Sequence, residues 1–148
     1  MSLGGGGGEM QQITQQIEQL EQTKQAIEAE IEQLQEEKRE IDEAIDAIEE
    51  LEDGSTVQVP IGGGAYVRAE VQDMDEIIVD LGADYSAERD KDGATSSLET
   101  KKEKIDEQIE EFREEIAQVE TETQELEEQA EQMQAQQLQQ LQQQQQDE

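Results

Sequence analysis

The stretch that decides the fold runs from residue 10 to residue 48 and reads MQQITQQIEQLEQTKQAIEAEIEQLQEEKREIDEAIDAI. Apolar residues recur in it at alternating steps of three and four, which is the spacing of a coiled-coil helix. The a positions are Met10, Ile17, Ile31 and Ile45, and the d positions are Ile13, Leu20, Ile27, Leu34, Ile41 and Ile48. We therefore expect one long helix that buries a narrow apolar stripe against a partner helix.

Two lysines, Lys24 and Lys38, interrupt this stripe at a positions. A lysine at an a position lowers stability but can fix the register and the choice of partner. Alternatively, its aliphatic stem packs along the seam while its ammonium group reaches solvent. We favour the second interpretation and leave the first open.

A second heptad run follows in the C-terminal half of the chain. Its apolar residues are Leu98, Ile105, Ile109, Phe112, Ile116, Val119, Leu126, Ala130 and Met133. The two runs predict two helices of about 45 residues, each roughly 65 Å long at 1.5 Å per residue. In an antiparallel hairpin of such helices, the numbers of facing residues should add up to about 147, with Lys38 near Ile109 and Glu110.

The segment between the runs has the pattern of short β-strands, at residues 56–61, 65–71, 76–81 and 85–89. Gly62-Gly63-Gly64 joins the first pair and Gly82-Ala83-Asp84 joins the second, as tight hairpin connections do. Pro60 has no N–H group, so it belongs on an edge strand or at a bulge. Because two isolated hairpins are only marginally stable in water, we expect strands of other subunits to complete a sheet or barrel.

Together these patterns predict an α+β fold, a long antiparallel two-helix coiled-coil hairpin with two β-hairpins at its base. The expected segments are a flexible Gly-rich tail at 1–8, coiled-coil helix 1 at 9–53, a double β-hairpin assembly element at 54–92, coiled-coil helix 2 at 93–141, and a Gln-rich acidic tail at 142–148. Gly54 is expected to cap the end of the first helix. Ser96, with Glu99 three residues later, predicts a capping box at the start of the second.

Composition excludes several classes of function. Hydrophobic residues make up 32% and aromatic residues 2% of the 148 residues, too few for one large core. The absence of cysteine and histidine removes disulfides, thiolate chemistry, the usual general base and the commonest transition-metal ligand. We find no catalytic constellation, and we predict that the protein is not an enzyme and has no cofactor and no metal site.

The charge of the chain is strongly negative. Forty-one acidic residues against ten basic ones give a formal net charge of -31, which argues against nucleic acid as a partner. Such a charge opposes compaction at low salt, whereas at ~1 M salt the Debye length falls to about 3 Å. We hypothesise a salt-rich cytoplasm, as in a halophilic archaeon. No apolar run approaches the ~20 residues of a membrane span, and residues 1–8 do not resemble a signal peptide, so we expect a soluble cytoplasmic protein.

One acidic segment imitates a calcium loop. Glu88, Asp90, Asp92, Gly93 and Glu99 fall at the EF-hand positions for acids, glycine and the final glutamate. The first residue is Glu instead of Asp, and a predicted strand precedes the loop where an EF-hand has a helix. We favour a turn at Asp92-Gly93, with Glu99 in the capping box.

The outer ends of the two stripes hold candidate binding residues, which are Met10, Ile13, Met133, Leu138 and Leu141. Partly exposed Met and Leu side chains offer an adaptable apolar surface for varied partners. Ordinary seam packing with frayed ends is the alternative for each of them.

The middle segment resembles a known family. Residues 59–67 are similar to the signature segment of alpha-class subunits of archaeal prefoldin and read Val59-Pro60-Ile61-Gly62-Gly63-Gly64-Ala65-Tyr66-Val67. Residues 79–85 resemble the second hairpin of that family, with Asp84 where the family often has another glycine. The resemblance covers residues 9–141.

This resemblance implies a hexamer of two alpha and four beta subunits, in which a second alpha subunit and the beta subunits supply the missing strands. The oligomerisation residues would be Val57, Val59, Ile61, Gly62, Gly63, Gly64, Tyr66, Val67, Ile77, Val79 and Tyr85. It also implies an ATP-independent holdase that grips non-native polypeptides with its coiled-coil tips and passes them to a group II chaperonin. A structural coiled-coil protein that bridges two partners without chaperone activity is the alternative.

Overall fold

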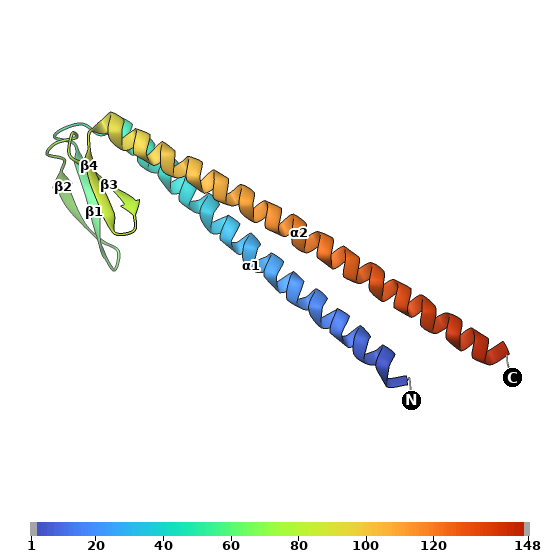
Figure 1. Ribbon diagram of the computed structural model, residues 1–148. Coiled ribbons are helices and arrows are strands. Elements are labelled where there is room, and N and C mark those ends of the chain that lie inside the picture. The colour runs from blue at the N-terminus through green and yellow to red at the C-terminus, as the bar shows by residue number, and fades with distance from the viewer. Residues whose placement is uncertain (1–2, 147–148) are drawn as a thin grey trace. The chain divides into compact units, whose positions relative to one another are not determined.

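The computed structural model describes residues 3–146, which form two long helices with two β-hairpins between them along the chain (Figure 1). The elements are α1 (Leu3–Glu50), β1 (Thr56–Gly62), β2 (Ala65–Glu70), β3 (Ile77–Gly82), β4 (Tyr85–Arg89) and α2 (Lys91–Gln146). The predicted α+β class and the order of elements are confirmed. The described parts of both predicted tails are helical, while residues 1–2 and 147–148 lie outside the described residues.

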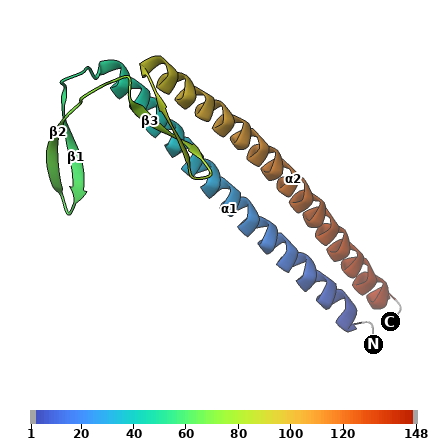
Figure 2. The same ribbon diagram turned by 60° about the vertical axis from the view of Figure 1, so that its left-hand side comes forward.

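The chain divides into two compact units. The terminal unit combines Met1–Glu32 with Ile109–Glu148, and the middle unit is Gln33–Gln108. In each unit a segment of α1 lies against a segment of α2 with the opposite chain direction. All four strands belong to the middle unit, where they form two separate two-stranded sheets (Figure 2).

A thin apolar seam is the core of both units. The buried residues are Ile13, Ile27 and Ile109 in the terminal unit, and Ile41, Met74, Val79, Ala94, Leu98 and Ile105 in the middle unit. Ile13, Ile27 and Ile41 are predicted d positions two heptads apart, so the heptad assignment is confirmed at these residues. Full burial of such a side chain contributes about 1.5–3 kcal/mol to folding. No polar or charged side chain is buried among the described residues.

The first helix ends before the predicted glycine cap. α1 stops at Glu50, and a turn follows in which Ser55 N donates to the Glu52 carbonyl oxygen at 3.0 Å. Gly54, with φ +86°, lies inside this turn and donates its N–H to Val71 O at 2.7 Å. The prediction that Gly54 caps the helix is therefore wrong, because the glycine serves the turn into the first hairpin.

The first hairpin has the predicted tight connection. β1 pairs with β2 in antiparallel register, with Val59 opposite Val67 and Gly62 opposite Ala65, which leaves Gly63 and Gly64 as the turn. Both turn glycines have positive φ, as a type I′ hairpin turn requires. The register shifts between Pro60 and Gly62, so the predicted bulge beside the proline is confirmed.

The second hairpin makes the same kind of turn without glycine at its centre. β3 pairs with β4, with Gly82 opposite Tyr85, so Ala83 and Asp84 form the turn at φ 50° and 64°. Asp80 Oδ1 accepts a hydrogen bond from Gly82 N at 2.9 Å. The chain therefore keeps the turn that a glycine would favour, although a left-handed conformation costs a residue with a Cβ atom about 1–2 kcal/mol.

The second helix begins five residues before the predicted capping box. Asp90 caps it, because its Oδ1 accepts from Gly93 N at 2.7 Å and its carbonyl oxygen accepts from Ala94 N at 2.8 Å. Ser96 and Glu99 consequently lie within α2, and the capping box is a wrong prediction. The calcium-loop alternative is wrong for the same reason, because a strand, a cap and a helix occupy residues 88–99.

Candidate functional site

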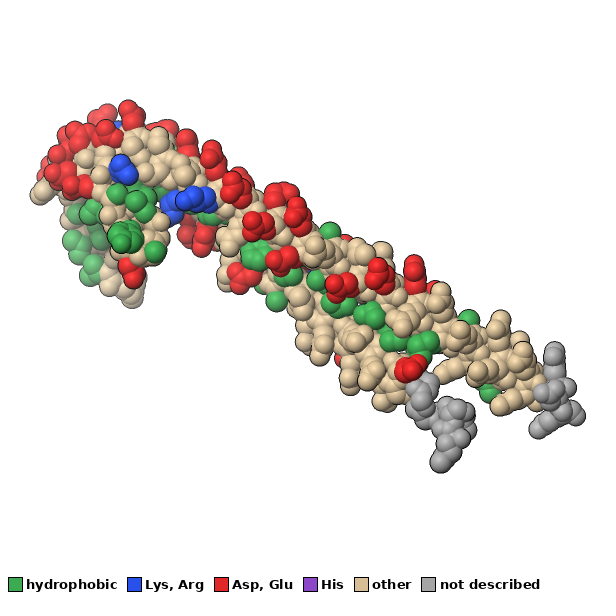
Figure 3. Space-filling model, in the orientation of Figure 1, with side chains coloured by type: hydrophobic (Ala, Val, Ile, Leu, Met, Phe, Trp, Pro, Cys, Tyr) green, Lys and Arg blue, Asp and Glu red, His purple; other side chains and the backbone are tan. Residues whose placement is uncertain are grey.

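An apolar surface covers the two hairpins of the middle unit (Figure 3). Its side chains are between 43% and 73% exposed. We call the following set the hairpin surface: Val59, Ile61, Tyr66, Val67, Ile78, Leu81 and Tyr85. A protein that stays monomeric rarely exposes so many large apolar side chains on one small element, so this surface indicates an interface.

The hydrogen bonding of the strands also indicates an interface. β1 pairs only with β2 and β3 only with β4 among the described strands, so each strand has one edge without a partner strand. Free edges offer N–H and C=O groups to strands of another chain. A two-stranded hairpin is also marginal alone in water. Exposed apolar side chains and open edges together indicate that the hairpins dock with further strands.

The predicted oligomerisation residues lie on this element with different exposures. Val59, Ile61, Tyr66, Val67 and Tyr85 belong to the hairpin surface. Val57 and Ile77 are half-buried, Val79 is buried within the middle unit, and Gly62, Gly63 and Gly64 are exposed.

Sequence reasoning missed two residues of the hairpin surface, Ile78 and Leu81. Successive residues of a strand point to opposite faces, which separates Ile78 from Ile77 and Val79, but the sequence alone does not say which face is outward. Val79 faces the interior of its unit, so its neighbour Ile78 must face outward.

A lysine attaches the second hairpin to α2. Lys101 Nζ donates to the backbone oxygen of Asp80 in β3 at 2.8 Å. Met74 N, between the hairpins, donates to Asp53 Oδ1 at 2.7 Å. The first bond connects β3 to α2, and the second connects the segment between the hairpins to the turn that follows α1.

The predicted tip residues lie in the terminal unit and differ in accessibility. Leu138 and Leu141 are 61% and 58% exposed on α2, and Met10 and Met133 are half-buried. Ile13 is 6% exposed and is part of the seam. The structure thus leaves two leucines and two methionines accessible to a partner.

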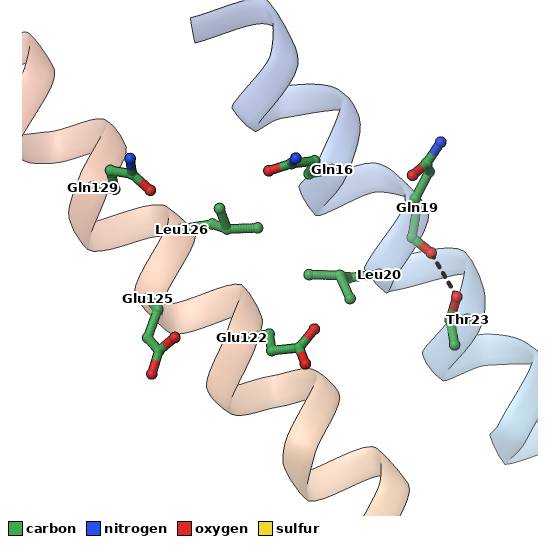
Figure 4. A pocket seen from close by; sticks show the side chains of 8 residues that line it. All are labelled: Gln16, Gln19, Leu20, Thr23, Glu122, Glu125, Leu126 and Gln129. Atoms are coloured by element: carbon green, nitrogen blue, oxygen red, sulfur yellow. Dashed lines mark hydrogen bonds between the residues drawn. The ribbon is translucent and has the colours of Figure 1, made fainter. Parts of the chain in front are cut away.

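The seam of the terminal unit contains a gap between Leu20 and Leu126, whose side chains point toward each other across it (Figure 4). Its volume is about 460 Å³, and its other lining residues are Gln16, Gln19, Thr23, Glu122, Glu125 and Gln129. Thr23 Oγ1 donates to Gln19 O at 2.9 Å within α1. Two leucines inside a polar rim form a weakly packed layer, so the helices are held together less firmly here than at a filled seam.

Lysines at a positions join the helices through ion pairs. Lys24 Nζ lies 3.2 Å from Glu120 Oε1, Lys38 pairs with Asp106, and Lys102 pairs with Asp42 at 2.6 Å. The lysine side chains are only 28–30% exposed, so the prediction of packed stems with ammonium groups at the edge is confirmed. Lys38 was predicted to lie near Ile109 and Glu110, and its ammonium group reaches Asp106, three residues before Ile109 on the same helix.

Two of these ion pairs raise the pKa of their lysine. The hydrogen bond and charge of Glu120 raise the pKa of Lys24, and the hydrogen bond to Asp42 raises the pKa of Lys102. Among the described residues there is no group of three or more acids that could hold a metal ion. Nor does any described helix carry a stretch long and apolar enough to cross a bilayer.

These features define a class, a coiled-coil hairpin protein whose helices are joined through an exposed β assembly element. Residues 20–146 match the prefoldin family, described as prefoldin subunit. The chain belongs to the prefoldin family, and it is a chaperone subunit of the archaeal alpha class.

Relatives from salt-loving archaea are similar over much of the chain. Prefoldin subunit alpha of Haloarcula marismortui is 61% identical over 114 residues, which are 77% of this chain and 74% of that protein. Prefoldin subunit alpha of Halobacterium salinarum is 63% identical over 59 residues, 40% of this chain and 38% of that protein. Among solved structures, filamentous prefoldin from Methanocaldococcus jannaschii matches with a TM-score of 0.54 at 27% identity, covering 78% of this chain and 93% of that one.

Proposed function

We propose that this chain is the alpha subunit of a hexameric holdase, with two alpha and four beta subunits. The hexamer binds unfolded polypeptide in the cytoplasm without ATP and passes it to a group II chaperonin. The single observation that carries the proposal is the hairpin surface, seven exposed apolar residues on two sheets with open edges. It suits a subunit whose β element is completed by other subunits.

Assembly holds several pairs of helices in one complex, and this arrangement gives the tip residues their function. Leu138 and Leu141, with Met10 and Met133, form small apolar contact areas. Each one binds an unfolded chain weakly, and several acting together raise the avidity by ~100-fold or more. Methionine adapts to irregular apolar partners, as clients of varied sequence require.

The partners follow from the charge as well. A net charge of -31 repels nucleic acid and the anionic surface of a membrane. The clients are therefore non-native polypeptides, which offer apolar segments to the tip residues. The other proteins in the proposed cycle are a second alpha subunit, beta subunits and the chaperonin that receives the client.

The tip residues are tested in the assembled complex. The chain is co-expressed with a beta-type subunit of the same organism, and aggregation of a denatured client is followed by light scattering in high salt without ATP. Leu138→Ser with Leu141→Ser should abolish most of the suppression that the alpha subunits contribute, while the mass of the hexamer stays unchanged. Gln139→Ser with Gln140→Ser is the matched control on the same exposed turn. Full suppression by the leucine variant in an intact hexamer would refute the tip assignment.

The hairpin surface is tested separately. Ile61→Ser with Ile78→Ser removes one large apolar side chain from each sheet. We expect loss of the hexamer in size-exclusion chromatography with light scattering, while the circular dichroism of the helices persists. A hexamer that forms normally, or a wild-type hexamer that fails to suppress aggregation, contradicts the proposal; the latter outcome favours a structural bridging protein. Transfer of a bound labelled client to added chaperonin tests the last step.

A further inference from the structure

The three cross-helix ion pairs share one register. In Lys24–Glu120, Lys38–Asp106 and Lys102–Asp42 the two residue numbers add up to 144 each time. The first pair lies in the terminal unit and the other two in the middle unit. Each pair joins a lysine at an a position to an acid on the other helix. These sums describe lysine side chains that reach an offset position on the other helix, and they do not contradict the predicted value of about 147 for facing residues, since Leu20 and Leu126, which point toward each other, add up to 146.

A heptad repeat alone cannot choose this register. A slip of seven residues keeps the apolar stripes in contact, because both stripes repeat every seven residues. It also keeps acids opposite lysines, since Lys24 would face Glu127 in one slip and Lys38 would face Glu99 in the other. In a chain with 41 acidic residues, attraction to an acid discriminates weakly between registers.

The residue that distinguishes the observed register from the slipped ones is positively charged. Along α2, the positions that face the a-position lysines are spaced by seven residues and read Glu99, Asp106, Arg113, Glu120 and Glu127. Arg113 lies midway between the two acids that bind Lys38 and Lys24. A slip of one heptad in either direction therefore places Arg113 opposite a lysine, Lys38 in one case and Lys24 in the other.

In the observed register, Arg113 meets no lysine. The residue whose number adds up to 144 with Arg113 is Ile31, and the guanidinium NH1 of Arg113 pairs with Glu110 of its own helix at 3.3 Å. We propose that Arg113 fixes the register of the antiparallel helices by repelling the lysines that both one-heptad slips would bring against it. Like charges across a helix contact are unfavourable, and here the repulsion acts only in the wrong pairings.

The proposal concerns the terminal unit above all. Lys24–Glu120 is the only cross-helix ion pair among the described residues of that unit, and the gap at Leu20 and Leu126 weakens its seam. The strands and the two ion pairs of the middle unit hold the register there by other means. The unit that carries the tip residues therefore depends most on Arg113.

Spin labels measure the register directly, because the chain has no native cysteine. Gln15→Cys and Gln118→Cys place labels on exposed positions of α1 and α2 in the terminal unit. A slip of one heptad moves one label roughly 10 Å along the helix axis. Double electron–electron resonance of the full chain in its hexamer, labelled only on the alpha subunit and diluted with unlabelled alpha, reports the distance within one chain.

Arg113→Glu should add distance maxima on either side of the main one, with a slipped population about two- to fivefold above that of the wild type. Arg113→Lys should restore a single maximum. Arg39→Glu is the matched control, since Arg39 also pairs with an acid three residues away in its own helix and is similarly exposed, but lies on α1 away from the stripe. A single unchanged maximum in Arg113→Glu, or the same new maxima in Arg39→Glu, would overturn the proposal.

Discussion

Lys24 Nζ lies 3.2 Å from Glu120 Oε1 and joins the two helices of the terminal unit across their seam. The hydrogen bond to Glu120, and then its charge, raise the pKa of Lys24 above the ordinary value of 10.5. A raised pKa in the folded state means that the ion pair stabilises the fold below pH 10.5. That contribution is lost as the pH rises through the folded pKa of Lys24.

Glu120→Gln should therefore lower the melting temperature of the terminal unit at neutral pH, with a difference from wild type that disappears at strongly alkaline pH. Glu127→Gln, one heptad along the same helix and exposed, is the control with the same change of charge. Melting followed by circular dichroism at a series of pH values gives the comparison. A difference that stays constant across the alkaline range would contradict a role for the charge of Lys24.

Salt dependence follows from the net charge of -31. At ~1 M salt, repulsion between the acidic faces of the helices is largely screened, whereas at ~0.01 M it acts over about 30 Å. We expect the helical circular dichroism signal and the melting temperature to fall as salt is removed. Sodium chloride and potassium chloride should act alike if screening is the cause. Full helicity and an unchanged melting temperature at low salt would contradict this prediction.

The turn of the second hairpin stores strain that glycine would relieve. Ala83 has φ 50°, a conformation that disfavours any residue with a Cβ atom. Ala83→Gly should stabilise the β3–β4 hairpin by about 1 kcal/mol, measured as slower amide hydrogen exchange in β3. Gly63→Ala makes the reverse change in the first hairpin and should speed exchange in β1. Equal exchange in Ala83→Gly and wild type would show that the turn carries no strain.

Asp90 stabilises the start of α2. Its carboxylate accepts the N–H of Gly93 at 2.7 Å, so Asp90→Ala should lower the free energy of unfolding by about 1 kcal/mol. Asp92→Ala removes an acid from the same first turn without removing the cap and should cost only a few tenths of a kcal/mol, roughly. Urea unfolding followed by circular dichroism distinguishes them, and equal losses would argue against the cap.

We expect the cap that Asp90 forms at the start of α2 to require glycine at position 93. A Cβ atom at this position would lie 2.8 Å from Asp90 Oδ1, closer than normal contact allows. Gly93→Ala should therefore destabilise the chain even though alanine favours helices by ~1 kcal/mol over glycine. In an Asp90→Ala background the order should reverse, with Gly93→Ala stabilising. The absence of that reversal would mean that the cap and the glycine act independently.

Much of the fold could be predicted because the heptad spacing of apolar residues and the residue types in the turns indicate the same arrangement of helices and hairpins. The heptads gave both helices, and the triglycine segment and Pro60 gave the first hairpin and its bulge. Helix ends were less predictable, since Asp90, Ser96 and Ser97 all precede apolar positions and have side chains that can cap. Only the hydrogen bonds show that Asp90 is the residue that caps α2, and that Gly54 belongs to a turn.

The candidate site was predictable in part for a related reason. The apolar pattern of β1 and β2 indicated Ile61 and Tyr66 as interface residues, but in the apolar run Ile77-Ile78-Val79 the sequence does not say which residue faces outward. Along a coiled coil, the residues near the chain ends look like seam residues. Three-dimensional packing was needed to separate the buried Ile13 from the exposed Leu138.

The open strand edges make the stability of the subunit depend on its partner chains. A subunit whose sheets are finished only by other chains has a stability that rises with the concentration of those chains. We expect a subunit without partners, whose apolar strands stay exposed, to be cleaved by proteases faster than an assembled one. The bulge beside Pro60, where no N–H is available, discourages pairing with a stray strand at that edge. We therefore expect the supply of partner subunits to set how much of the chain escapes proteolysis.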